Sequence, residues 1–292
     1  MILNREVNIL TMRVFCTITF LILVTFSSTR AFCQQLTREQ VDDTISKMAS
    51  FSMYEDNYFI SGVPLNEDIN KQTADAKYQI SFKQLITRKT LPLDSYLFLT
   101  YTQTAFWNVY DTSSPFEEIN FNPGISLGKP VYNSDDRLIG MAFLNTQHES
   151  NGRDSIYSRS WNKLSLSFKA ALTDRIHMSI EGWFPFRYKK DNPDLMEYVG
   201  PGELDFTYDL KPDRLALEVM VRKGLNWEWK GAVRTRLSYR PFKMRTHRLT
   251  LEWFHGYAES LISYNEFTSM VRVGFLFKSD DLNFLKPAPN QY

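Results

Sequence analysis

The chain of 292 residues carries 34 basic and 33 acidic side chains, which leaves a formal net charge of +1. That balance provides no general case for a nucleic-acid partner, whose phosphates call for an excess of basic residues. The length allows one large domain or two small ones, and 12 glycines and 12 prolines exclude a low-complexity chain.

The N-terminal segment is typical of an export signal. A basic segment precedes the apolar run VFCTITFLILVTF, and Ala31 lies at position −3 of a cleavage point after Cys33. We therefore expect residues 1–33 to be a signal peptide, with Met12 as an alternative start to Met1. A lipid anchor on Cys33 is the rival interpretation, which the bulky Phe32 before it disfavours.

Both cysteines, Cys16 and Cys33, fall in this leader, so the mature chain would contain none. Export without disulfides argues against a small cross-linked extracellular module and against thiol chemistry. Residues 34–50, QQLTREQVDDTISKMAS, are expected to form a short periplasmic lead-in with a helical turn or two.

From about residue 51 onward, polar and apolar residues alternate. In LSLSF, Leu164, Leu166 and Phe168 share one face, while Ser165 and Ser167 share the other. This period of two predicts strands that each have one apolar face. The twelve segments expected to be strands are residues 53–63, 76–87, 93–110, 119–128, 136–148, 160–173, 175–188, 199–210, 213–224, 230–241, 246–259 and 264–278.

A soluble β-sandwich would also alternate, so the polar faces decide between the two folds. In a sandwich these faces meet water and seldom carry dense rows of both charge signs. Here successive polar faces carry opposing charges, and the other faces are aliphatic with aromatic ends; the clearest charged positions are Arg214, Glu218, Arg222, Arg234 and Arg236. A membrane barrel has this layout, and a sheet in hydrocarbon has to close because it cannot leave an open edge.

We therefore predict an all-β fold, a twelve-stranded antiparallel transmembrane β-barrel over residues 51–279, in the outer membrane of a Gram-negative bacterium. Residues 280–292 would be a C-terminal tail, and no second domain or long repeat is visible. If both termini are periplasmic, the loops 111–118 and 149–159 lie on the same, outer rim.

A polar cluster interrupts the apolar wall near that rim. Asn162 is in phase with Leu164, and His148 and Ser150 are in phase with Leu144, so all three polar side chains should face lipid. One interpretation is that they lie among headgroups, above the hydrocarbon. The other is a catalytic set, with Ser150 as nucleophile, His148 as its base and Asn162 orienting the imidazole.

Gln103 is a second polar position on an apolar face. It is in phase with Leu99, Tyr101 and Trp107, which puts an amide in the lipid zone. Either a bulge turns Gln103 inward, or the amide makes a hydrogen bond to another subunit.

The cluster carries a resemblance to a known family. HESNGRDSIYSRSWN resembles the signature of the bacterial outer-membrane phospholipase A family, H-x-S-N-G-R followed by S-R-S-W-N. Three further blocks agree in the same order: YTQTAFWNVYDTSSPFEEIN, DNPDLMEYVG and GYAESLISYN. The segment between Trp107 and Ser113 looks shorter than in the best-known members of that family, so the loop there is expected to sit differently.

The resemblance implies a twelve-stranded barrel that hydrolyses acyl esters of phospholipids and lysophospholipids, with A1 and A2 activity. It also implies dependence on Ca²⁺ and activation by formation of a homodimer. Carried over position by position, the family's roles fall as follows: catalysis on His148, Ser150 and Asn162, the oxyanion contact on Gly152, calcium on Ser113, the carbonyl of Arg153 and the partner's Ser158, and the dimer interface on Gln103.

Two other functions remain open for the same architecture. A passive pore is disfavoured because charged rows would fill so narrow a lumen, and an adhesive barrel is disfavoured because the expected outer loops are short.

Overall fold

The structure, a computed structural model, describes residues 36–241, 243–244, 246–279 and 285. The predicted signal peptide and nearly all of the predicted tail lie outside these residues. In the part that is described, no helix is long and apolar enough to cross a membrane.

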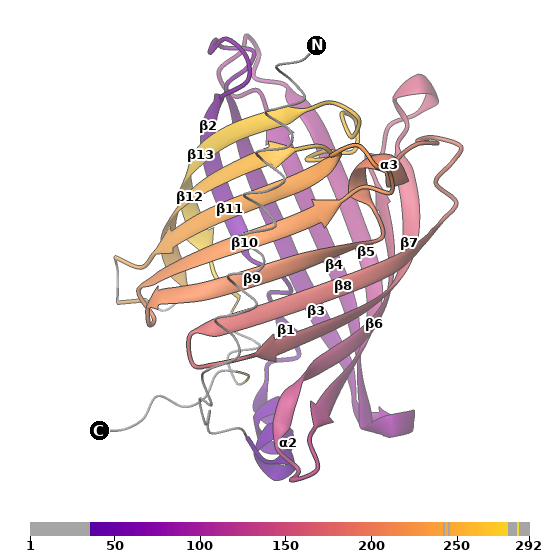
Figure 1. Ribbon diagram of the computed structural model, residues 1–292, viewed down its shortest axis with the longest axis vertical. Helices are drawn as coiled ribbons and strands as arrows, with labels where there is room; N and C mark the ends of the chain where they lie inside the picture. The colour runs from indigo at the N-terminus through magenta and orange to yellow at the C-terminus, as the bar shows by residue number, and fades with distance from the viewer. Residues whose placement is uncertain (1–35, 242, 245, 280–284, 286–292) are drawn as a thin grey trace. The chain divides into compact units, whose positions relative to one another are not determined.

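Twelve antiparallel strands form a closed ring (Figure 1). In chain order they are β2 (Asn57–Pro64), β3 (Asp75–Leu91), β4 (Ser95–Trp107), β5 (Phe116–Tyr132), β6 (Leu138–Ser150), β7 (Ser160–Ala171), β8 (Ile176–Phe186), β9 (Gly202–Lys211), β10 (Leu215–Lys223), β11 (Gly231–Tyr239), β12 (His247–Gly256) and β13 (Thr268–Phe277). Each strand pairs with its neighbours in sequence, and β13 pairs with β2, which closes the ring. The predicted twelve-stranded barrel is confirmed.

The first predicted strand, 53–63, is wrong in its opening residues. The short strand β1 (Phe51–Ser52) pairs with β3 beyond the end of β2, and residues 53–56 interrupt the two. Asp56 accounts for part of the interruption, because its carboxylate lies 3.1 Å from the Lys278 ammonium and accepts a hydrogen bond from Ser279 N at 2.9 Å. Alternation along the sequence carries no sign of such a contact.

The predicted division into a lipid-facing and an interior face is seen along the strands. In β12, Leu249, Leu251 and Trp253 are exposed on the outer wall, while Thr250 and Glu252 are buried inside. Arg214 is an exception among the charged positions, since it lies exposed in the turn before β10 and not on a strand.

Buried ion pairs fill the lumen. The Lys77 ammonium lies 3.1 Å from Glu252 and 2.9 Å from Glu259, and the Arg272 guanidinium lies 2.7 Å from both Asp75 and Glu259. None of these side chains is more than 9% exposed. Removing one partner would leave a buried charge uncompensated, which costs about 3–5 kcal/mol.

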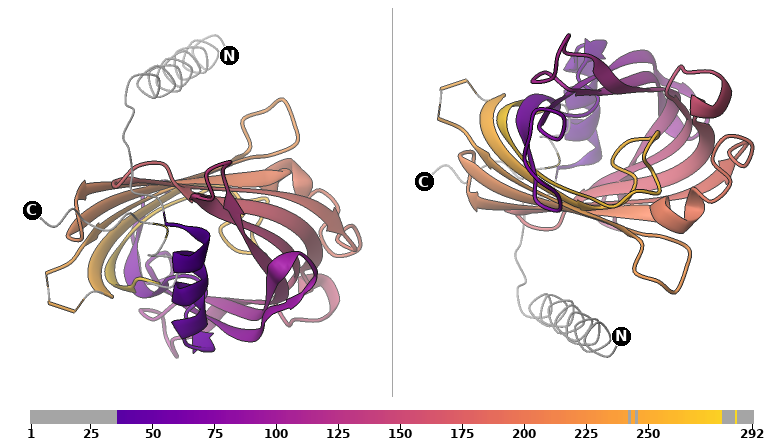
Figure 2. Two further views of the ribbon diagram at one scale, coloured as in Figure 1. Left: turned by 90° about the horizontal axis from the view of Figure 1, so that it is seen from below. Right: turned by 90° about the horizontal axis from the view of Figure 1, so that it is seen from above.

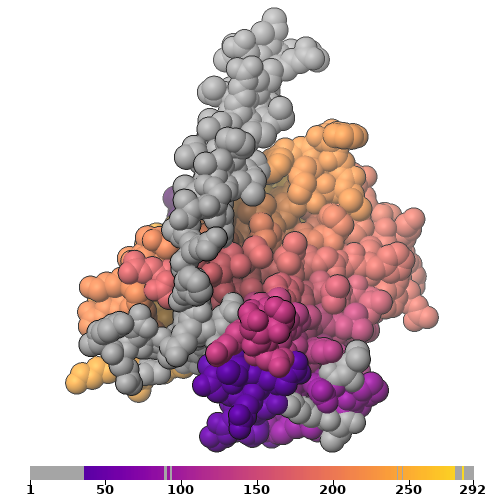
Figure 3. Space-filling model, turned by 60° about the horizontal axis from the view of Figure 1, so that its bottom comes forward, coloured from indigo at the N-terminus to yellow at the C-terminus, as the bar shows by residue number. Residues whose placement is uncertain are grey.

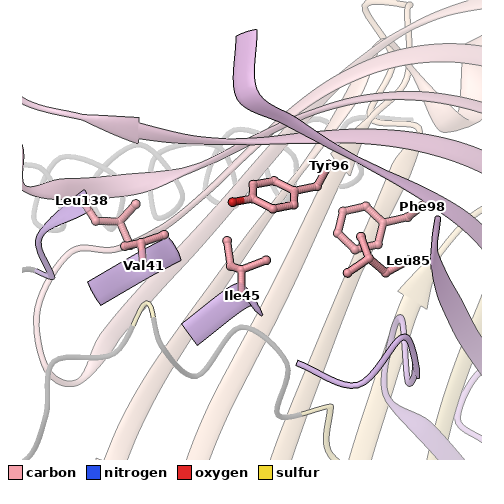
Figure 4. Packing of buried hydrophobic residues seen from close by; sticks show 6 residues of the cluster. All are labelled: Val41, Ile45, Leu85, Tyr96, Phe98 and Leu138. Atoms are coloured by element: carbon pink, nitrogen blue, oxygen red, sulfur yellow. The ribbon is translucent and has the colours of Figure 1, made fainter. Parts of the chain in front are cut away.

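The helix α2 (Arg38–Lys47) packs against one end of the barrel. Thr37 and Gln40 form a capping box at its N-terminus. Its buried face meets inward side chains of three strands (Figure 4), and the cluster consists of Val41, Ile45, Leu85, Tyr96, Phe98 and Leu138. Arg38 also lies 3.0 Å from Asp136, and α2 borders the β5–β6 turn in Figure 3.

Leu138 corrects one detail of the predicted phase. Alternation puts it on the outer face with Leu144, but it is buried in the α2 cluster. The β5–β6 register shifts between Val131 and Tyr132, so a bulge inverts the faces at this end of β6.

We call the rim opposite α2 the outer rim. It is formed by the loops 65–74, 108–115, 151–159, 187–201, 224–230 and 257–267. The last of these reaches into the mouth of the barrel (Figure 2). Its residues Leu261 and Tyr264 are buried against Trp161 of β7 and against the short helix α3 (Met196–Val199).

Candidate active site

His148 and Asn162 are directly opposite each other on β6 and β7. The His148 Nδ1 and the Asn162 Oδ1 are 3.0 Å apart, and Asn162 Nδ2 donates to the Phe186 carbonyl at 3.5 Å. With Asn162 Oδ1 as acceptor, Nδ1 carries the proton, and Nε2 of the neutral ring is left with its lone pair. The imidazole is therefore held in one tautomer.

Ser150 lies two residues beyond His148 on the same outer face, as predicted, and is paired across the ladder with Ser160. Its hydroxyl makes no hydrogen bond to another residue in the described ranges, whereas the Ser160 hydroxyl donates to Asp191 at 3.0 Å. Glu149, the inward residue between His148 and Ser150, accepts a hydrogen bond from the Trp161 indole at 2.8 Å. His148, Ser150 and Asn162 share the outer face of the barrel, as the alternation predicts.

The rim loop 151–159 carries Gly152 and Arg153. Gly152 has φ +66°, a left-handed conformation that glycine adopts readily, and an added Cβ would meet the Phe121 ring at 3.1 Å. Asn151 organises this loop, because its Oδ1 accepts from Arg153 N at 3.3 Å and from Arg159 N at 3.0 Å.

Ser113 and Ser158 lie on loops of the outer rim, so the predicted common rim is confirmed. Ser113 is exposed, with φ +64°, in the loop 108–115. The Ser158 hydroxyl donates to Asp191 at 3.4 Å. Within the described ranges, no group of three or more His, Cys, Asp or Glu side chains could hold a metal ion.

Gln103 lies on the outer face of β4, since its pairings with Ile80 and Phe121 are regular. The alternative of a bulge that turns it inward is wrong. Its carbonyl accepts from the Tyr101 hydroxyl at 2.9 Å, so the amide is not wholly without a partner within one chain.

The phospholipase A1 family profile matches residues 35–277. The chain belongs to the phospholipase A1 family. The phospholipase A1 of Escherichia coli K12 is 31% identical over 243 residues, which are 76% of this chain and 80% of that one. A putative phospholipase A1 of Neisseria meningitidis is 29% identical over 232 residues, which are 75% of this chain but only 59% of that relative's length.

Solved structures of the family agree with the fold. The outer-membrane phospholipase of Salmonella typhi, a dimer with bound calcium, is 27% identical with a TM-score of 0.71, over 82% of this chain and 96% of that one. An active-site mutant of the Escherichia coli enzyme, in which an asparagine is replaced by alanine, has 27% identity and a TM-score of 0.71, over 84% and 99%. This family member is therefore a phospholipase of the Gram-negative outer membrane.

Sequence reasoning missed Asp191 and Asn192, which fasten the loop 187–201 beside the site. Asn192 is wholly buried, and its Oδ1 accepts from Ser160 N at 3.1 Å. The block DNPDLMEYVG, which begins at Asp191, was the only signal in the sequence, and alternation assigned it to a loop. Its proximity to Ser158 and Ser160 depends on the pairing of β7 with β8.

Proposed function

We propose that this phospholipase hydrolyses acyl esters of phospholipids and lysophospholipids, with A1 and A2 activity, at a Ser-His-Asn site on its lipid-facing wall. The observation that carries the proposal is the His148–Asn162 pair at 3.0 Å with Ser150 on the same outer face. A catalytic site on this wall would meet the ester bonds of lipids that surround the barrel.

In the first half of the reaction, Ser150 Oγ attacks the ester carbonyl carbon and its proton passes to His148 Nε2. Collapse of the tetrahedral intermediate releases the alcohol, a lysophospholipid, which takes the proton from the imidazolium. In the second half, water attacks the acyl-serine carbonyl and gives a proton to His148 Nε2; the bond to Ser150 Oγ breaks, Oγ takes that proton back, and the fatty acid is released. Asn162 orients the ring in both halves. The alanine-substituted asparagine of the Escherichia coli active-site mutant supports this role.

The oxyanion would receive a hydrogen bond from the backbone N–H of Gly152. The left-handed turn at this residue, φ +66°, is one that a larger side chain would adopt only with strain. The nearby Phe121 ring leaves little room for a Cβ, at 3.1 Å.

The donor set at the rim fits calcium. Hydroxyls of Ser113 and Ser158 and the carbonyl of Arg153 are hard oxygen ligands, which Ca²⁺ prefers, and they carry no charge. Asp191, which accepts from Ser158 at 3.4 Å, would contribute negative charge beside them. When bound, the ion would add positive charge next to the developing oxyanion.

Two subunits would complete this site. Calcium takes about 6–8 oxygens, so Ser113 and Arg153 of one chain are too few, and the partner's Ser158 would add to them. The Salmonella typhi enzyme is a dimer with calcium, which supports this proposal. Gln103, on the outer wall of β4, would lie at the interface and offer its remaining amide hydrogens to the partner subunit.

Fatty-acid release from mixed detergent–phospholipid micelles tests the proposal. We expect release with calcium, little with a chelator, and none from Ser150→Ala under either condition. Equal release with calcium and with chelator would remove the ion from the mechanism. Release by Ser150→Ala at the wild-type rate would remove the serine.

A further inference from the structure

A buried carboxylate lies behind the catalytic wall. Glu118 is on the inner face of β5, near the outer rim, and its side chain is 0% exposed. Its Oε1 accepts from Asn120 Nδ2 at 2.9 Å, and its Oε2 lies 3.2 Å from Arg153 Nε. A buried charge is costly unless it is paired, and Arg153 provides the partner. What the ion pair does for the protein is then the question.

Arg153 connects this carboxylate to the rim loop. Its guanidinium extends from the loop 151–159 to Glu118 and also donates to the backbone carbonyl of Glu117. Both contacts are made by the side chain. The backbone of the same residue, with Gly152 before it, carries the proposed calcium and oxyanion contacts.

Hydrogen bonds of the Asn151 side chain hold the loop 151–159 together beside this ion pair. Asn151 is only 4% exposed, and it accepts from Arg153 N and Arg159 N and donates to Tyr157 O at 2.9 Å. These bonds fix the loop internally. Its attachment to β5 runs through the Glu118–Arg153 ion pair, the bond from the Arg153 guanidinium to the Glu117 carbonyl, and an interaction of the Asn151 amide with Glu118.

Glu118 is in turn held from the lumen. Asn120, its hydrogen-bond donor, accepts from Leu261 N at 3.2 Å. Leu261 belongs to the loop 257–267, which reaches into the barrel mouth (Figure 2). A continuous series of contacts therefore runs from the interior loop through Asn120 and Glu118 to the outer loop.

We propose that Glu118 is a positioning residue for catalysis: it acts through the Arg153 side chain to set the backbone of Gly152 and Arg153 against Ser150. The inference rests on the proposed function. Glu118 itself faces the barrel interior and touches neither lipid nor the reacting atoms.

Glu118→Gln keeps the shape of the side chain and removes its charge. The guanidinium would then lose the carboxylate that it pairs with at 3.2 Å, and the loop backbone would shift from its position beside Ser150. Displacements of about 1 Å at such sites can cost about 100-fold in rate. We expect kcat to fall about 10- to 100-fold with KM changed less than about twofold, because substrate binding involves the outer wall and not the lumen.

The experiment compares Glu118→Gln with Glu117→Gln, the same chemical change one residue away. Glu117 accepts from the guanidinium through its backbone carbonyl, which the substitution keeps, and its carboxylate acts on Arg153 only at longer range, so this control should keep kcat within about twofold. Heat-modifiable migration on a gel shows that each barrel is folded. Covalent labelling of Ser150 by a serine-directed sulfonyl fluoride adds a readout without phospholipid, and its rate should fall with kcat in Glu118→Gln.

Ser150→Ala distinguishes a failure of the positioning role of Glu118 from a failure of the proposed function. If it is inactive and unlabelled while Glu118→Gln has wild-type kcat and labelling, the positioning role is wrong and the proposed function stands. If Ser150→Ala is active, the proposed function itself fails.

A second variant tests the proposal if Glu118→Gln does not fold. Arg153→Gln changes the same ion pair from the rim, where the side chain is 39% exposed, and also removes the bond to the Glu117 carbonyl, so it should lower kcat and labelling at least as much as Glu118→Gln. When both variants fold, the double variant should be no worse than Arg153→Gln alone. Wild-type kcat in folded Arg153→Gln would overturn the proposal.

Discussion

At the scale of single residues, the proposed chemistry depends on side chains that contribute little to the fold. The Ser150 hydroxyl has no hydrogen-bond partner in the described ranges. Ser150→Ala should therefore abolish fatty-acid release in the micelle assay and leave heat-modifiable migration unchanged. His148→Ala should behave in the same way, because it removes the base assigned to Ser150. A hydrolysis rate above background in either variant would contradict its assigned role.

Asn162 should be less critical than Ser150. Asn162→Ala removes the bond to His148 Nδ1 at 3.0 Å, so the imidazole loses its orientation, but the base remains. A hydrogen bond of about 1–3 kcal/mol corresponds to a loss of about 5- to 150-fold in rate. Initial rates in the micelle assay measure it. If Asn162→Ala were as inactive as Ser150→Ala, Asn162 would do more than orient the ring.

At the scale of elements, α2 stabilises the barrel and takes no part in catalysis. Ile45 is 3% exposed and packs against Leu85, Tyr96 and Phe98 inside the barrel end. Ile45→Ala should lower the free energy of unfolding by about 2–5 kcal/mol. Denaturant unfolding in detergent checks this, with activity of the folded protein retained.

Lys47→Ala is the matched control on the same helix. Lys47 is exposed and pairs with Asp43 at 2.7 Å on the helix surface. Such a pair contributes about 0.3–0.5 kcal/mol, so the unfolding midpoint should hardly move. An equal destabilisation by the two substitutions would mean that α2 does not pack in the barrel end as described.

At the scale of the whole molecule, the filled lumen argues against a pore. Ion pairs lie across the interior: the Lys77 ammonium and the Arg272 guanidinium are each 2.7–3.1 Å from two carboxylates. Arg236 adds a further pair with Glu252 at 2.6 Å. We expect the folded protein in a planar bilayer to show no stable open conductance. Regular channel openings from protein that is inactive as a lipase would favour the pore interpretation.

Dimerisation should switch activity on. Because the calcium ligands are proposed to come from two subunits, monomers should hydrolyse esters slowly even when Ser150 and His148 are intact. Crosslinking in detergent across a calcium titration, with hydrolysis measured on the same samples, should show dimer and activity rising together. Full activity in purely monomeric samples would contradict this, and with it the supply of Ser158 by the partner subunit.

Much of the barrel and of the site could be predicted from the sequence, because alternation along a strand is local. It was sufficient for the twelve strands and for the outward position of His148, Ser150 and Asn162. The parity of the strands was sufficient to put the loops of Ser113 and Ser158 on one rim. The assignment of calcium and of individual roles came from the resemblance, and alternation alone would not have led to it.

Only the tertiary structure decided the contacts between segments that are distant in the chain. The interruption at residues 53–56 includes a contact of Asp56 with the distant Lys278, and the inversion at Leu138 accompanies a bulge beside β5. The Glu118–Arg153 pair spans 35 positions of sequence, and Asp191 reaches Ser158 across 33. These pairs exist because closure of the barrel sets which loops and inner faces meet, and no local pattern in the sequence encodes that geometry.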